Sequence, residues 1–403
     1  AAAVDELVDT GTKADVSRRY TAQFFVLLVV SQLLLYGAAA VALRRESGRP
    51  DARRTRMLQA LRRTALVFAA VPVSTYLVNL FPWWRTGVPL LSLTAALLVC
   101  LVAVTAVAQL GPWRHRLLGP FGAVAAITGL VMLADVVSGS ALQMSSLMGY
   151  SALVAGRFYG FGNPAFSVFA TAMLLAATAL ADWLLVAGRR RTAVVAVAAV
   201  GVVAVVADGW PRFGSDFGGV IALVPGFAVL ALLVAGARIS WLRVVLIGLA
   251  AVATISLVAY LDWRHPPAER SHLGRFVQQV IDGDAATVVR RKLEANLDAF
   301  RNWLLALLVP IGFAFVVVVL MRPGASRAAS LARAYDRSPT LRLGVISLIV
   351  ALGVGFAVND SGIAIPAIAL FLAIPLVLAA SVRALELDER DATKPAPARR
   401  PAR

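Results

Sequence analysis

The sequence has little charge and almost no cysteine. Only 15% of its 403 residues are charged, whereas 60% are hydrophobic, and the mean hydropathy is +0.79. A soluble domain of this length does not need so many apolar residues to fill its core. The single cysteine, Cys100, excludes a disulfide framework and a cysteine-based metal site, and we expect it to be a small packing residue.

Signatures of several enzyme classes are also missing. The sequence contains no Walker A loop, no Rossmann glycine fingerprint, no HExxH and no GxSxG. It therefore gives no support to an ATPase, a dehydrogenase, a zinc protease or a serine hydrolase.

Long apolar stretches recur along the whole chain instead. Each can cross a hydrocarbon layer of roughly 30 Å as a helix, which satisfies its own backbone polar groups. The sequence thus predicts an all-α, polytopic transmembrane helix bundle of about eleven helices. Their predicted ranges are 22–43, 64–81, 87–110, 117–137, 164–187, 192–208, 217–237, 241–261, 301–321, 342–358 and 362–383.

The loops between these helices alternate in charge. One set carries two thirds of the 39 Lys and Arg residues but only a third of the 22 Asp and Glu residues. It comprises 44–63, 111–116, 188–191, 238–243, 322–341 and the C-terminal tail. The positive-inside rule places this set in the cytoplasm, so we expect an N-out, C-in protein of the plasma (inner) membrane. Topology and lipid contact then explain the net charge of +17, and no nucleic-acid partner is expected.

The two termini differ from the predicted transmembrane domain over 22–383. Residues 1–21 begin without Met or an apolar signal, so we expect an extracytoplasmic linker that follows a missing upstream region. The tail 384–403 is polar and rich in Pro and Ala, which predicts a disordered cytoplasmic segment. The polar outer loops gather at 138–362, where we expect the site region.

The first outer motif is a glycine-punctuated, aromatic segment at 142–164. Asn163 followed by Pro164 is typical of a helix start, because Asn caps free amides and Pro fits the first turn. Arg157 and Tyr159 lie beside three glycines, and close backbone approach next to a cation suits an anionic ligand.

The second outer motif surrounds a Pro/Gly turn at 207–219. Ser215 or Asp216 is placed to cap the following helix, and Asp208 is placed to pair with Arg212. The alternative is that Asp208 and Asp216 bind a divalent cation or act as a base, since hard cations prefer oxygen ligands.

The third outer motif is the long loop 262–300. Its apolar residues recur at helical spacing in two stretches, which predicts two short amphipathic helices on the membrane surface. His272 is the best-placed histidine for catalysis. The other polar candidates either bind substrate or face lipid headgroups, and they are Arg275, Arg291, Lys292 and Asn296.

The fourth outer motif joins the last two predicted helices almost without a loop. Asn359 and Asp360 precede Ser361 and Gly362, a composition typical of a tight turn. An acid this close to the hydrocarbon needs a partner, so we expect Asp360 to meet another outer motif.

Together the four motifs predict one anion site at the outer face. Several predicted helices begin there and direct their partially positive ends towards it. Arg157, Arg212, Arg275, Arg291 and Lys292 add cationic side chains. The acids Asp208, Asp216 and Asp360 would then hold a divalent cation or activate an acceptor hydroxyl.

The order of these motifs carries a resemblance. At GRFYGFGN, GSDFGG, SHLGR with the following RRKLEANL, and NDSG, the chain resembles a family of bacterial, actinobacterial-type polytopic membrane proteins with no assigned reaction. The resemblance covers roughly residues 130–370. It implies the architecture, the location of the site and an upstream extracytoplasmic domain similar to the alkaline-phosphatase superfamily. Pro164 stands where a common form of the motif has an acid, so no carboxylate role is carried over to that position.

Three functions compete on these observations. The leading hypothesis is a cell-envelope enzyme or enzyme subunit that binds a lipid-linked phosphate or glycan at the outer leaflet, for example a glycosyl- or phospho-transferase. Its catalytic candidates are Asp216, His272 and Asp360. The second is a transporter or flippase of an anionic lipid, which needs a polar path and finds only Asp182 inside a span. The third is a membrane anchor that docks the upstream ectodomain.

Overall fold

The chain is an integral, multi-pass membrane protein built from α-helices. Its computed structural model contains ten helices that are long and apolar enough to cross a membrane, counted over the described residues. Those residues are 2–44, 52–151, 159–238, 240–267, 270, 272–283, 287, 290, 314, 316–324, 329–359 and 364–392. The predicted all-α, polytopic bundle is confirmed.

The helices follow one another through mostly short connections. The first six are α1 Ala2–Arg44, α2 Ala52–Leu77, α3 Pro89–Leu110, α4 Gly119–Val137, α6 Asn163–Val186 and α7 Arg190–Gly209. The next six are α8 Phe217–Val234, α9 Trp241–Trp263, α10 His272–Ile281, α13 Ala329–Arg337, α14 Pro339–Val358 and α15 Ala364–Ala392. Short 3-10 turns lie between α2 and α3 and between α3 and α4, and they are η1 Val78–Leu80, η2 Trp83–Arg85 and η3 Pro112–His115.

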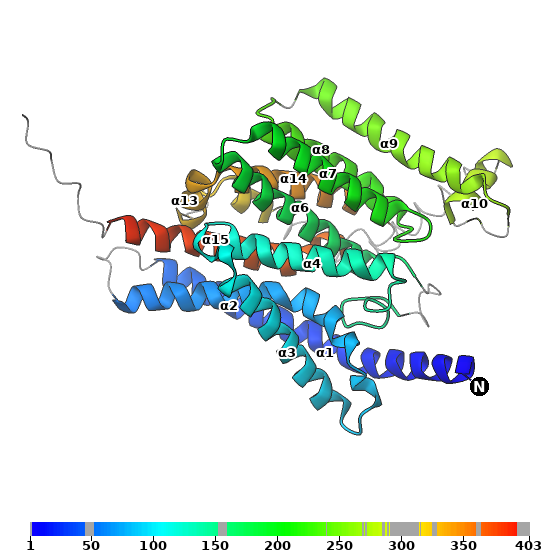
Figure 1. The fold of residues 1–403 in the computed structure, drawn as a ribbon, viewed down its shortest axis with the longest axis horizontal. Coiled ribbons are helices and arrows are strands. Elements are labelled where there is room, and N and C mark those ends of the chain that lie inside the picture. Colours follow the sequence, from blue (N-terminus) through cyan, green and yellow to red (C-terminus); the bar gives the residue numbers. More distant parts are fainter. Residues whose placement is uncertain are drawn as a thin grey trace, which may run out of the picture.

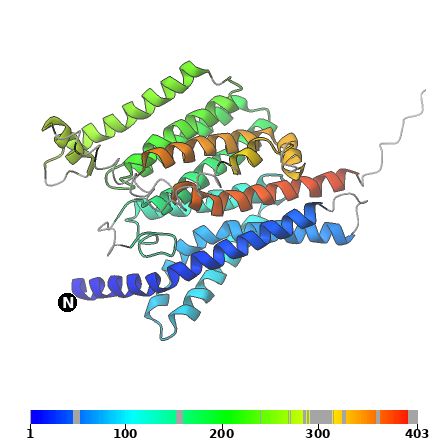
Figure 2. The same cartoon turned by 180° about the vertical axis from the view of Figure 1, so that it is seen from behind.

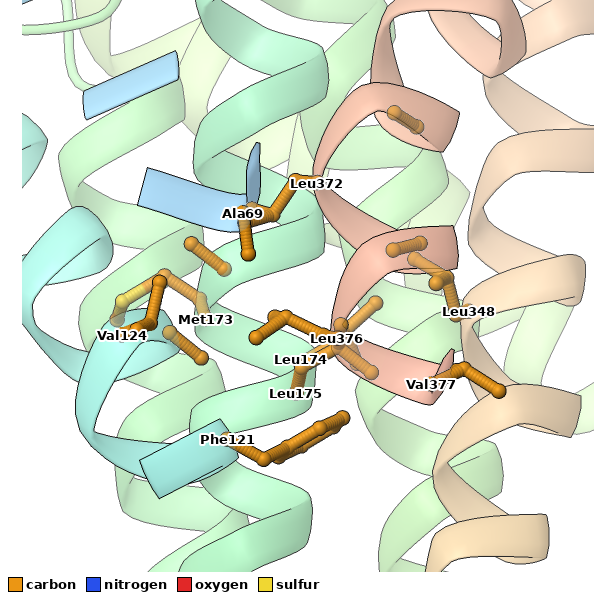
Figure 3. Close-up of a cluster of buried hydrophobic side chains, with 14 of the residues drawn as sticks. Ala69, Phe121, Val124, Met173, Leu174, Leu175, Leu348, Leu372, Leu376 and Val377 are labelled. Atoms are coloured by element: carbon orange, nitrogen blue, oxygen red, sulfur yellow. The ribbon is translucent and has the colours of Figure 1, made fainter. Parts of the chain in front are cut away.

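The core lies where α6 and α15 pass through the middle of the bundle. α6 contacts α4, α7, α8, α14 and α15, and α15 also packs along α2. Figure 3 shows side chains from five helices meeting there, namely Ala69, Phe121, Val124, Met173, Leu174, Leu175, Leu348, Leu372, Leu376 and Val377. The outward faces of α1, α3 and α9 remain largely exposed and apolar, as lipid contact requires.

The bundle has two chemically different ends (Figures 1 and 2). The motif end carries the N-terminus, the described part of the α4–α6 connection, the α7–α8 connection, α10 and the end of α14. The arginine end carries the start of α2, η3, α13 and the last turns of α15. The segments predicted as outer motifs therefore lie together, as far as they are described.

Several predicted boundaries are wrong because tertiary contacts extend the helices. Residues 2–21, predicted as a linker, are the first turns of α1. Half of the predicted loop 44–63 belongs to α2, which begins at Ala52. The predicted disordered tail 384–403 is helical up to Ala392 as part of α15. The predicted span 301–321 lies mostly outside the described residues, and its described end at 316–321 is helical.

Ion pairs explain why α15 continues past the apolar span. Glu386 contacts Arg62 at 2.9 Å and Arg383 at 2.7 Å, and the Arg383 and Glu386 residues are 4% and 3% exposed. Glu389 contacts Arg54 at 2.6 Å. Acidic residues of the tail therefore pair with the arginine-rich start of α2. These ion pairs explain why the polar segment 384–392 is helical.

The short helix α13 was not predicted within the loop 322–341. Its buried side chains include Leu331 and Tyr335, and the Tyr335 hydroxyl donates to Leu320 O at 2.9 Å. Arg337 at its end pairs with Asp388 and Asp391 of α15 at 2.5 and 2.7 Å. These carboxylates, Asp391 first, raise the pKa of Arg337 above its usual value. Because the apolar face of α13 packs against the bundle, part of the predicted loop 322–341 is helical.

Asp182 has a local role at the arginine end. It lies one turn before the end of α6, and Ser338 Oγ donates to its Oδ1 at 2.6 Å. Ser338 is also the N-cap of α14. Asp182 is therefore a hydrogen-bond acceptor within the bundle.

Candidate functional site

Backbone contacts join the motif segments at the motif end. Phe161 N donates to Gly214 O at 2.8 Å, which connects the first motif to the second. A side-chain Cβ at Gly160, whose φ is +84°, would overlap the same carbonyl, so only glycine fits there. The ring of Phe217 lies 6.2 Å from that of Phe276, which connects the second motif to α10.

The second motif places two buried acids at the start of α8. Asp216 is the N-cap of α8, and its Oδ1 accepts a hydrogen bond from Gly219 N at 3.2 Å. The Asp208 side chain is fully buried, and a Cβ at Gly219 would overlap its Oδ2. Both carboxylates therefore lie beside the positive end of the α8 dipole, which stabilises negative charge. The predicted capping role of Asp216 is confirmed.

Asn359 of the fourth motif meets the same turn. It follows the last residue of α14 and is buried, and its side chain lies so close to Gly218 that a Cβ there would overlap it. The last two glycines of GSDFGG thus let Asp208 and Asn359 approach the first turn of α8. The neighbouring Asp360 lies outside the described residues.

The connection from α4 to α6 is held from both sides. Asp135, near the end of α4, accepts hydrogen bonds from Leu142 N at 2.7 Å and Gln143 N at 3.1 Å. From α1, Ser17 Oγ donates to Ser145 O at 2.7 Å, and Lys13 Nζ lies 3.4 Å from Ala141 O. The early start of α1 is explained by these contacts, because they dock its first turns on the motif end.

Backbone strain also gathers at the motif end. Within the described part of the chain, the residues other than glycine with positive φ are Ser140 at 67°, Ser145 at 56° and Ser215 at 49°. Such conformations cost roughly 1 kcal/mol each in a residue with a side chain. Ser140 Oγ accepts from Gly160 N at 3.0 Å, so a strained residue just before the first motif is joined to the last part of that motif.

Of the two amphipathic helices predicted in the third motif, the first is confirmed as α10, and the second, at 289–300, lies almost wholly outside the described residues. Asp262 at the end of α9 is 2% exposed, and its Oδ2 accepts a hydrogen bond from Gly274 N at 2.6 Å. Gly274 is in the first turn of α10, so an acid from one helix satisfies a free amide of the next. No role was predicted for Asp262, because its partner lies across a loop.

The predicted cap of α6 is one residue off. Gly162, in an extended conformation, is the N-cap, and Asn163 is the first helical residue with Pro164 in the first turn. Gly162 occupies this position because a Cβ there would lie only 3.3 Å from Tyr150. Asn163 contributes its carbonyl, which accepts from Ser167 Oγ at 2.8 Å.

The predicted cations at the motif end lie on its surface. Arg212 and Arg275 are exposed, and Tyr159 is 42% exposed. His272 begins α10, but its side chain is outside the described part. Other predicted site residues lie outside it altogether, and they are Arg157, Arg291, Lys292, Asn296 and Asp360.

The predicted divalent cation stays a prediction. Among the described side chains, no group of three or more His, Cys, Asp or Glu residues is close enough to hold a metal ion. Asp208 and Asp216 share one turn, where Asp216 N donates to Asp208 O at 3.0 Å, but the third predicted ligand, Asp360, is not described.

Comparison with protein families, with curated proteins and with solved structures finds no match to this chain.

Proposed function

We propose that this membrane protein is a cell-envelope enzyme or enzyme subunit that binds a lipid-linked phosphate or glycan substrate at the outer leaflet. The observation that carries the proposal is the meeting of separate motifs at one end of the bundle. Tyr159, Arg212 and Arg275 are exposed on segments that the Phe161–Gly214 hydrogen bond and the Phe217–Phe276 contact hold together.

The arginines carry anion recognition in this proposal. The start of α8 already accommodates Asp208 and Asp216, so its amides are less suited to an incoming phosphate. Arg212 and Arg275 have no ion pair within the described residues. A guanidinium binds phosphate through two parallel hydrogen bonds, and a lipid brings its phosphate to the depth at which these helices end.

The chemistry proposed is transfer of a glycosyl or phospho-group to an acceptor hydroxyl. Asp216, His272 or Asp360 would take the proton of that hydroxyl as its oxygen attacks. In glycosyl transfer the lipid-linked phosphate would leave with the bonding electrons, whereas in phospho-group transfer the lipid alcohol, or the lipid phosphate of a pyrophosphate donor, would leave with them. As an alternative role within this proposal, Asp208, Asp216 and Asp360 would bind a divalent cation.

Binding of a polyprenyl phosphate tests the anion site. The full chain in phosphatidylcholine nanodiscs is titrated with this lipid, and the Arg212→Gln/Arg275→Gln variant is compared with wild type. Two lost charge-assisted contacts should weaken binding by tenfold or more, on the order of 1.5 kcal/mol each. Arg190→Gln, an exposed arginine at the arginine end, is the matched control and should bind normally. Equal weakening by both variants would contradict the site.

Alanine variants of Arg157, Asp216, His272 and Asp360 separate the candidate functions. Loss of product formation in folded variants favours the enzyme, whereas unchanged product with lost lipid movement favours a transporter. Preserved activity in all four variants favours a membrane anchor. This function would agree with the proposed family relation, which implies an upstream ectodomain.

The distribution of charge favours the enzyme over the transporter. The charged side chains of the described spans lie towards their ends, as with Asp135, Asp182 and Asp208. The midspan amide of Gln32 donates to Phe371 O at 3.1 Å and is thereby used within the bundle. A transporter needs polar groups that continue to the midplane.

A further inference from the structure

The end of α9 has the composition of a membrane–water boundary. Tyr260 and Trp263 lie with their rings 6.1 Å apart at the last turn of this apolar, mostly exposed helix. Tyr and Trp concentrate at the level of the lipid headgroups, because one end of each ring is apolar and the other is polar. Tyr260 and Trp263 therefore indicate the depth at which the lipid phosphates lie.

Two arginines at this depth are positioned by neutral groups. Arg264 Nη1 donates to the Tyr260 hydroxyl at 3.3 Å. Arg270 Nε donates to His265 O at 2.9 Å, and its guanidinium lies 5.5 Å from the centre of the Trp263 ring. Neither arginine forms an ion pair with any described carboxylate. Both side chains are thus oriented by neutral groups, and no described carboxylate neutralises their charge.

α10 completes this arrangement. Gln278 Oε1 accepts from Trp263 Nε1 at 2.9 Å and from Arg270 Nη1 at 3.2 Å. Gln278 Nε2 donates to Asp282 Oδ1 at 3.0 Å, which fixes the orientation of the amide. The bond from Gly274 N to Asp262 keeps α10 beside α9, so the contact between Arg270 and Gln278 depends on that docking.

We propose that Arg264 and Arg270 form a binding site for the phosphate of an anionic phospholipid in the leaflet at the motif end. Guanidinium groups suit a phosphate through their planar donors, and two of them attract a lipid of net negative charge over a zwitterionic one. The surrounding apolar surface of α9, with exposed Leu257 and Leu261, contacts the acyl chains. This lipid site uses residues other than those of the proposed substrate site and does not depend on the proposed function.

Photocrosslinking tests the site in the full chain. The protein is reconstituted into phosphatidylcholine vesicles with a trace of a photoactivatable phosphatidylglycerol or phosphatidylcholine probe, and crosslinked peptides are quantified by mass spectrometry. The peptide covering 260–281 should prefer the phosphatidylglycerol probe by about tenfold, given two arginines near the surface. Arg264→Gln/Arg270→Gln should reduce that preference to about the level of bulk lipid.

Control variants make the result specific. Arg243→Gln, at the other end of α9, should leave the preference of peptide 260–281 unchanged. Gln278→Ala keeps both charges but removes the group that orients Arg270, and it should give an intermediate preference even if the double variant fails to fold. Two results would overturn the proposal. One is equal crosslinking of the wild type by both probes, and the other is a wild-type preference retained by both Gln278→Ala and Arg264→Gln/Arg270→Gln.

Discussion

The two ends of the bundle differ in the partners of their acidic side chains, except that Asp9 at the motif end also pairs with an arginine, Arg85. At the arginine end, Glu386 and Glu389 meet arginines of α2. At the motif end, Asp135, Asp216 and Asp262 accept hydrogen bonds from backbone amides. Pairing acids with arginines neutralises a basic surface, whereas pairing them with amides fixes the shape of loops and helix starts. The difference leaves exposed arginines such as Arg212 and Arg275 available at the motif end.

Breaking the buried ion pair should have the largest effect. Glu386→Gln leaves Arg383 buried with a neutral partner, and loss of one member of such a pair costs on the order of 3 kcal/mol. Thermal unfolding in detergent should show the largest decrease of any variant here. The double variant Arg383→Met/Glu386→Met should recover most of the loss, because apolar side chains need no counter-charge. A double variant as unstable as the single one would argue against the pairing.

Removing an amide-holding acid should have a smaller and more local effect. Asp135→Ala leaves the amides of Leu142 and Gln143 without their acceptor, at a cost of about 2 kcal/mol. Hydrogen exchange should become faster at 138–150 and stay unchanged in α13. Asp135→Asn retains one acceptor oxygen and should show about half the effect. If Asp135→Ala accelerated hydrogen exchange equally at 138–150 and in α13, the stability of one end would depend on the other.

The smallest effect is expected at α10. Asp262→Ala removes the acceptor of Gly274 N, and loss of a helix-capping contact costs about 1 kcal/mol. Exchange of the α10 amides should accelerate while global unfolding changes little. Gln279→Ala, a change at an exposed residue of α10, is the control. An identical response of the two variants would show that Asp262 does not anchor this helix.

The sequence predicts the spans well because their signal is local. Long apolar runs locate ten of the predicted helices, and helical spacing in the third motif locates α10. The start of α1 and the end of α15 depend on contacts with distant segments, such as Ser17 with Ser145 and Glu386 with Arg62. No local pattern carries that information.

The parts of the candidate site that depend on local sequence were also predicted. Capping by Asp216 follows from its position before an apolar run, and the structure confirms it. The role of Asp262 could not be predicted, because its partner Gly274 is twelve residues away across a loop. Likewise, Asp208 and Asn359 meet α8 only through the packing of separate helices.

The most direct test of the account is thiol labelling from one side of the membrane. Single cysteines replace Tyr159, Arg212, Arg275 and Arg337 in a Cys100→Ser background, and intact cells are treated with a membrane-impermeant maleimide. The first three positions should be labelled before lysis, and position 337 only after it. If positions 159, 212 and 275 divided between the two sides, the motifs would not share one face and the proposed site would be contradicted.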